Sequence, residues 1–185
     1  MKKKLALFDL DGTLFNTNYS NFYGYKEALN KEGYDVTFEY FRDNCNGRHY
    51  KEFLPKLTNG NLEPLERIHD FKTSHYSDYV SKIIPNEHLF NIARSIKNDY
   101  YLVVVTTASK KNTYDILNYF KVLDLFDLVL THDDITKNKP NPEGFLKAME
   151  HYKIDKENTI IFEDSAPGIE AAKATGATVF VINQF

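Results

Sequence analysis

The feature of this sequence that most restricts its fold is a set of short, uninterrupted apolar segments. Five segments consist mainly of Val, Ile, Leu and Phe: Leu5–Leu10, Tyr101–Thr106, Leu128–Leu130, Thr159–Phe162 and Thr178–Ile182. Because their apolar residues are continuous rather than alternating with polar ones, they predict strands buried on both faces, as in a parallel sheet.

Segments with helical periodicity separate the later apolar segments. They are Glu87–Lys97, Asn112–Phe120, Pro142–Tyr152 and Ala166–Thr175. Pro142 suits the first turn of a helix, and Gly176 suits the left-handed position just after a helix end. Strands that alternate with helices in this way predict an α/β fold with a doubly wound, mainly parallel, Rossmann-like sheet.

The alternation is interrupted once, directly after the first apolar segment. The interrupting stretch is polar and rich in tyrosine, and three parts of it have helical periodicity: Asn21–Lys31, Arg48–Leu57 and Leu62–Ser81. It is far longer than the dozen or so residues that a crossover connection requires. We therefore predict a Rossmann-like core formed by residues 1–16 and 85–185, and a small helical cap formed by residues 17–84.

Composition and charge exclude several classes of protein. The 14 Phe and 13 Tyr residues argue against intrinsic disorder, and a formal net charge of −3 argues against a dedicated nucleic-acid binder. Cys45 is the only cysteine, as is typical of a reducing cytosol, and no apolar run approaches the ~18 residues of a membrane span. We expect a cytoplasmic protein with no nucleic-acid or membrane partner; a monomer is compatible with these numbers, which do not fix the oligomeric state.

Two aspartates stand at the end of the first apolar segment. Side chains alternate along a strand, so Asp9 and Asp11 can point to the same side, at the carboxyl end where open α/β sheets bind ligands. Gly12 permits a sharp exit from the strand. An Asp-Gly turn is the common alternative for either aspartate alone. A calcium loop is excluded because Leu14 and Ser20 stand where it requires Gly and Glu.

A second acidic pair, Glu163 and Asp164, ends another predicted buried strand. If the two strands are neighbours, three or four carboxylates meet in one crevice, where they repel one another unless a cation lies among them. Carboxylate oxygens with open positions suit Mg²⁺. The alternative is that Asp164 or Ser165 only caps the helix that begins near Ala166.

Two further parts of the sequence suit a phosphate ligand. Thr107, Ala108 and Ser109 end one strand and open a helix, so their hydroxyl and backbone N–H groups can face an anion. Lys139 lies in a proline-rich loop before another helix. A loop lysine is most often a surface residue, but beside an acidic site it supplies a cation that offsets carboxylate and phosphoryl charge.

Together these residues resemble the four ordered motifs of the haloacid dehalogenase superfamily. The matching residues are Asp9-Leu10-Asp11-Gly12-Thr13, Thr107, Lys139 and Glu163-Asp164. The segment Pro167–Gly176 is similar to the branch that contains phosphoglycolate phosphatase and β-phosphoglucomutase, and the helical insertion falls where that branch carries its cap.

The resemblance implies a role for each carboxylate. Asp9 would be the nucleophile that becomes an aspartyl-phosphate, and Asp11 the general acid that later activates water. Mg²⁺ would be held by the Asp9 carboxylate, the Asp11 backbone carbonyl and Asp164, with Glu163 beside them.

The resemblance also implies how the phosphoryl group is held. Thr107 and Lys139 would bind its oxygens, and backbone N–H groups near Gly12, Thr13 and Ala108 would help.

The function implied is a Mg²⁺-dependent phosphatase acting on a small phosphorylated metabolite. Asp11 separates this chain from the carbon–halogen enzymes of the superfamily, which lack an aspartate there. A phosphomutase is the alternative within the same chemistry, although Asn21 stands where the β-phosphoglucomutases carry a histidine. A non-catalytic module that binds metal and phosphate is the alternative from another class.

One cap segment is a candidate for substrate contact. It resembles the part of the cap that reaches the active site in this branch, and its residues Gly47, Arg48 and His49 are therefore predicted to touch the substrate. A solvated cap surface is the other interpretation.

Overall fold

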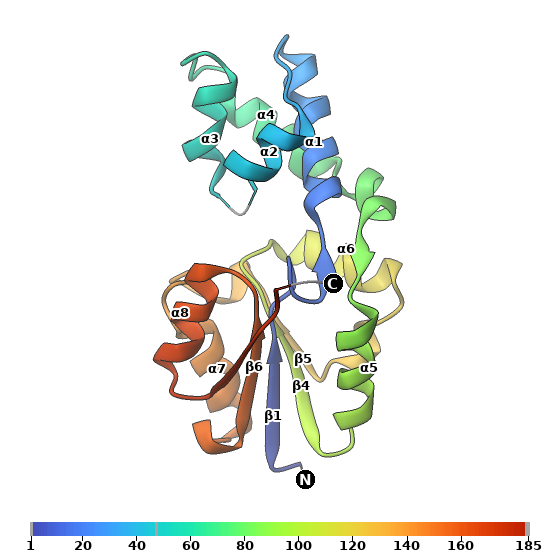
Figure 1. Ribbon diagram of the computed structural model, residues 1–185, viewed down its shortest axis with the longest axis vertical. Helices are drawn as coiled ribbons and strands as arrows, with labels where there is room; N and C mark the ends of the chain where they lie inside the picture. Colours follow the sequence, from blue (N-terminus) through green and yellow to red (C-terminus); the bar gives the residue numbers. More distant parts are fainter. Residues whose placement is uncertain (1, 47, 184–185) are drawn as a thin grey trace. The chain divides into compact units, whose positions relative to one another are not determined.

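The computed structural model describes residues 2–46 and 48–183. The chain forms two compact units (Figure 1). One, the core unit, consists of Met1–Asn16 and Ile84–Phe185; the other, the helical unit, consists of Thr17–Ile83. Ile84, predicted to belong to the cap, groups with the core unit, where it pairs with Asn16.

The core unit is built on a five-stranded parallel sheet. Its strands are β1 (Lys4–Phe8), β4 (Tyr100–Val105), β5 (Leu128–Leu130), β6 (Thr159–Glu163) and β7 (Thr178–Val181). They lie in the order β5-β4-β1-β6-β7, and Phe8 stands level with Val104 on one side and Phe162 on the other. The predicted α/β fold with a mainly parallel sheet is confirmed.

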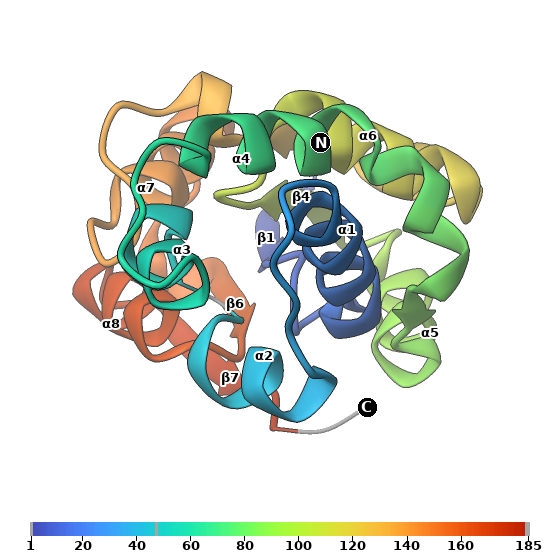
Figure 2. The ribbon, with the colours of Figure 1, turned by 90° about the horizontal axis from the view of Figure 1, so that it is seen from above.

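Helices cover both faces of this sheet (Figures 1 and 2). One face carries α5 (Glu87–Ile96) and α6 (Lys110–Tyr119), and the other carries α7 (Glu143–Tyr152) and α8 (Ala166–Ala174). The apolar core beneath α7 and α8 joins Phe145 and Ala171 to strand residues such as Leu7 and Val103. Short 3₁₀ turns connect the layers: η2 (Leu123–Leu125), η3 (His132–Asp134) and η4 (Lys156–Asn158).

Capping residues set the starts of three of these helices. The side chains of Asn86, Ser109 and Ser165 accept hydrogen bonds from the first turns of α5, α6 and α8. Gly176 follows α8 with a φ of +77°, the predicted left-handed conformation. Pro142, predicted inside α7, instead occupies the position just before it.

The prediction that every apolar segment is buried on both faces is wrong for β7. Thr178 is exposed, and Phe180 and Val181 are 48% and 45% exposed. The reason is topological, because β7 is an edge strand with only β6 as its neighbour.

The helical unit contains α1 (Asn18–Lys31), α2 (Phe38–Asn44), α3 (Tyr50–Leu57), α4 (Leu65–Ser74) and η1 (Tyr76–Lys82). Its own apolar core is rich in aromatic rings and includes Phe22, Tyr25, Phe41, Phe53 and Ile68. The third predicted helix is divided into α4 and η1, and α2 was not predicted.

A two-stranded ladder holds together the points where the chain leaves and re-enters the core unit. It consists of β2 (Phe15–Asn16) and β3 (Ile84–Pro85), which pair antiparallel. Strands of two residues are too short to produce a sequence pattern.

Among the described residues, none of the helices combines the length and apolarity that a membrane crossing demands.

Candidate active site

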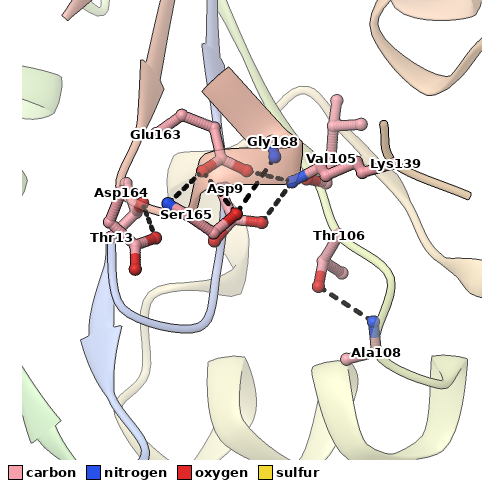
Figure 3. Close-up of polar contacts among 10 residues, drawn as sticks. All are labelled: Asp9, Thr13, Val105, Thr106, Ala108, Lys139, Glu163, Asp164, Ser165 and Gly168. Atoms are coloured by element: carbon pink, nitrogen blue, oxygen red, sulfur yellow. Dashed lines mark hydrogen bonds and ion pairs between the residues drawn. The ribbon is translucent and has the colours of Figure 1, made fainter. Parts of the chain in front are cut away.

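Three carboxylates converge at the carboxyl end of the sheet (Figure 3). Asp9 follows β1, Glu163 ends β6 and Asp164 follows it, and β1 and β6 are paired neighbours. One oxygen from each carboxylate lies within 4.8 Å of the others. Asp9 is 6% exposed and Glu163 is fully buried, so these charges lie largely out of contact with water.

Lys139 reaches this cluster from the loop before α7. Its side chain is 9% exposed, and its ammonium group pairs with the Asp9 carboxylate and, at 2.6 Å, with Glu163 Oε1. It also donates a hydrogen bond to the backbone oxygen of Val105 at 3.2 Å. Burial opposes its charge, but the two carboxylates outweigh burial and raise the pKa of Lys139. The structure therefore brings together the loop lysine and the two acidic motifs.

Burial also perturbs the carboxylates themselves. It raises the pKa of Asp9 to about 8, against the opposing effect of Lys139 and with a further contribution from Glu163. It raises the pKa of Asp164 to about 6, although the hydrogen bond from Thr13 opposes the shift. Crowded, buried carboxylates of this kind favour either a proton or a metal cation as partner.

The donor set suits a small divalent cation. All three side chains offer carboxylate oxygens, the ligand type that Mg²⁺ prefers. Gly12 keeps the approach to Asp164 open, because a Cβ there would lie 2.1 Å from Asp164 Oδ2. Its φ of +92° also favours glycine. The residues present therefore fit the predicted metal.

Glu163 is held by the start of α8. Its Oε2 accepts hydrogen bonds from the backbone N–H of Ser165 at 2.8 Å and from the Ser165 hydroxyl at 3.1 Å. The same hydroxyl accepts from the N–H of Gly168 at 3.1 Å, so Ser165 caps α8 and orients Glu163 together. A Cβ at Gly168 would lie only 1.7 Å from Glu163 Oε1.

The turn after β1 is closed by its own backbone. Gly12 N–H donates to the Phe15 carbonyl at 2.7 Å, and Asp11 forms a bridge with the same residue. Asp11 is half-buried, and its charge is one of the groups that raise the pKa of Asp9. Thr13, predicted as a backbone donor to phosphate, also donates its hydroxyl to Asp164 Oδ1 at 2.9 Å.

The predicted phosphate-binding segment after β4 makes hydrogen bonds within its own turn. Thr107 is exposed, while Thr106 is buried and its hydroxyl accepts a hydrogen bond from the Ala108 N–H at 3.0 Å. Figure 3 shows this pair apart from the carboxylates. The Ala108 N–H, predicted to face phosphate, has a partner within its own turn, and Ser109 caps α6.

The candidate substrate contacts of the helical unit lie on its surface. Arg48 and His49 are both exposed, and Gly47 lies outside the described residues. His49 precedes α3 and accepts a hydrogen bond from the N–H of Lys51 at 3.4 Å.

Some residues of the site were not found from the sequence. The carbonyl of Val105 and the glycine at 168 act through backbone position, which residue type does not report. Ser165 was predicted only as a helix cap. Ser165 also donates hydrogen bonds to Glu163. The only signal of this second contact in the sequence is that the serine stands two residues after the glutamate.

A parallel sheet covered by helices on both faces, with three carboxylates and a lysine at the carboxyl ends of its strands, places the chain among α/β proteins with a site at that edge of the sheet. A family model for haloacid dehalogenase-like hydrolases matches residues 6–182, and the chain belongs to that family. It is therefore a hydrolase.

The chain is also similar over most of its length to individual proteins, at about a quarter sequence identity. The chain is 26% identical to "Pyrophosphatase PpaX" of Halalkalibacterium halodurans, over 98% of this chain and 84% of that protein. It is 26% identical to "Phosphorylated carbohydrates phosphatase" of Thermotoga maritima, over 92% of this chain and 81% of that protein. The crystal structure of CbbY from Rhodobacter sphaeroides in complex with phosphate is similar in fold, with a TM-score of 0.82 and 24% identity over 100% of this chain and 88% of that one.

Proposed function

We propose that this protein is a Mg²⁺-dependent phosphatase that hydrolyses a phosphate monoester of a small metabolite. The observation that carries the proposal is the cluster of Asp9, Glu163 and Asp164 with Lys139 inserted among them. Relatives named as a pyrophosphatase and as a phosphatase of phosphorylated carbohydrates support the reaction class.

The proposed reaction has two displacements. An oxygen of the Asp9 carboxylate attacks phosphorus, the bond from phosphorus to the ester oxygen breaks, and Asp11 gives its proton to the leaving oxygen. Asp11 then takes a proton from water, whose oxygen attacks the aspartyl-phosphate. Inorganic phosphate leaves and the Asp9 carboxylate is restored.

Charge control is the second part of the proposal. Mg²⁺ would be held by Asp9, Asp164 and the Asp11 carbonyl with Glu163 beside them, and when bound it neutralises charge that repels the nucleophile. Lys139 pairs with Asp9, and in the proposed reaction its charge would also offset that of the phosphoryl group. Thr107 and the N–H of Thr13 stay predicted phosphate donors. The N–H groups of Gly12 and Ala108, also predicted, donate to the Phe15 carbonyl and the Thr106 hydroxyl and would have to exchange those partners to bind phosphate.

The test is a phosphate-release assay with Mg²⁺ over phosphorylated carbohydrates, pyrophosphate and an aryl phosphate. Asp9→Asn should abolish release while the far-ultraviolet circular dichroism spectrum is retained. Asp99→Asn is the matched control, since Asp99 is exposed and lies at the opposite end of the sheet, next to the start of β4. Full activity of Asp9→Asn would refute the nucleophile. Binding of Mg²⁺ and phosphate without turnover of any substrate would favour the non-catalytic module.

The same assay separates the phosphatase from the phosphomutase. A mutase would isomerise a sugar phosphate faster than it releases phosphate.

The role of the helical unit as a cap is part of the proposal. Arg48→Ala should raise KM for the best substrate without changing kcat if Arg48 contacts it. An unchanged KM would remove Arg48 from the substrate contacts.

A further inference from the structure

The position of the Lys139 ammonium group depends on a segment without regular secondary structure. Lys139 lies between η3 and α7, and its side chain is almost completely buried on its way to Asp9 and Glu163. A buried ammonium group cannot adjust freely, so the backbone of the segment must be fixed for both ion pairs to form. Backbone polar groups outside helices and strands need other partners.

Glu143, the first residue of α7, supplies those partners. Its Oε1 accepts a hydrogen bond from the Thr136 N–H at 2.8 Å. Its Oε2 accepts from the Thr136 hydroxyl at 2.8 Å and from the Lys137 N–H at 2.9 Å. Both carboxylate oxygens are thus engaged by two consecutive residues of the segment. These hydrogen bonds lower the pKa of Glu143, and a negative charge at a helix N-terminus is itself favourable.

The next two residues of α7 lie against Val105 and the Lys139 ammonium group. The ring of Phe145 is 1% exposed, and its centroid lies 5.1 Å from Lys139 Nζ. A Cβ at Gly144 would lie 2.9 Å from Val105 Cγ1, so glycine lets α7 come close to the strand whose carbonyl accepts from Lys139. The first turn of α7 therefore contacts both the segment and the surroundings of the ammonium group.

We propose that Glu143 is a positioning residue, which fixes residues 136–139 so that the Lys139 ammonium group stands between Asp9 and Glu163. Glu143 acts through the loop backbone. The catalytic consequence of this placement rests on the proposed phosphatase function, whereas the placement itself does not.

The placement is tested by chemical labelling of Lys139. Limited acetylation with acetic anhydride, read by mass spectrometry, reports how accessible each lysine amine is. Glu143→Ala removes the hydrogen bonds that the Glu143 carboxylate accepts from residues 136 and 137. Their loss should make acetylation of Lys139 about tenfold faster. Glu143→Gln should give an intermediate rate because its amide keeps one acceptor oxygen. Glu150→Ala is the control, since Glu150 is an exposed acid on the same helix.

The catalytic consequence is read separately, as kcat and KM for an aryl phosphate with Mg²⁺. We expect Glu143→Ala to lower kcat about tenfold or more, with partial recovery in Glu143→Gln and no change in Glu150→Ala. Thr136→Val removes one hydrogen-bond donor and leaves the Glu143 carboxylate in place, so it should lower kcat less than Glu143→Ala does. It replaces Glu143→Ala in the test if that variant fails to fold.

Equal labelling of Lys139 in the wild type, Glu143→Gln and Thr136→Val would overturn the positioning role. So would an unchanged kcat in both variants when the wild type is active. A wild-type protein that releases no phosphate would refute the proposed function alone, and labelling would still decide the role of Glu143.

Discussion

Replacing Gly168 by alanine should damage the site through a single methyl group. Gly168 lies in the first turn of α8, and the added Cβ would stand 1.7 Å from Glu163 Oε1 and 2.0 Å from its Cδ. Ordinary van der Waals contact between such atoms begins at 3.4 Å. The Glu163 carboxylate is fully buried in a closely packed interior, so it must give up its present position.

The cost follows from what holds Glu163 in place. The displaced carboxylate loses hydrogen bonds of 2.8 and 3.1 Å from Ser165 and an ion pair of 2.6 Å with Lys139. Breaking a buried charge pair costs about 3–5 kcal/mol, and alanine returns about 1 kcal/mol of helix propensity. We therefore expect the free energy of unfolding to fall by about 2–4 kcal/mol, and Mg²⁺-dependent phosphate release to fall with it.

The assay is urea unfolding followed by far-ultraviolet circular dichroism, arranged as a double-mutant cycle with Glu163→Ala. Without the Glu163 carboxylate there is no clash, so Gly168→Ala in that background should be neutral or stabilising by up to about 1 kcal/mol. An equal loss of stability in both backgrounds would show that the glycine is needed for another reason. No loss in the wild-type background would refute the steric argument altogether.

Two further predictions concern a proton donor and a half-buried histidine. Asp11→Asn should slow hydrolysis of alkyl phosphates by about 10²–10⁴-fold but aryl phosphates, which have better leaving groups, much less; an equal loss on both would contradict its role as acid. His69, stacked on Tyr50 and hydrogen-bonded to Tyr25, has a pKa lowered from 6.5 by burial and by Lys72. The unfolded chain then takes up a proton first as pH falls through 6.5, so the helical unit should lose stability in acid; His69→Gln should weaken that pH dependence of urea unfolding, and an unchanged dependence would contradict the assignment.

The layers of the core unit could be predicted from the sequence because their signal is local. Uninterrupted apolar segments mark the five strands, and serine or asparagine marks the helix starts. The metal-site hypothesis had to assume that β1 and β6 are neighbours. The sequence could not predict this, since strand order in a parallel sheet depends on the crossover connections rather than on local pattern. The exposure of β7 was missed for the same reason, because an edge strand can be as apolar as a central one.

The acidic motifs could be predicted from their positions at strand ends, but the geometry among them could not. The sequence shows that residue 163 is an acid. It does not show that Lys139 donates to one of its carboxylate oxygens and Ser165 to the other. Contacts that join residues 9, 139 and 163 depend on long-range packing, which a local pattern does not encode.

The charges within this cluster explain why the proposed reaction needs a divalent cation. Three buried or half-buried carboxylates face one ammonium group, so when all are ionised the cluster lacks two positive charges. Without a metal, burial raises the pKa of Asp9 to about 8, and the charge of Glu163 adds to that shift while Lys139 opposes it. A protonated Asp9 is a poor nucleophile at neutral pH. Mg²⁺ carries the two missing charges and would keep Asp9 ionised, so the same burial that suppresses the free carboxylate makes its reactivity depend on the metal.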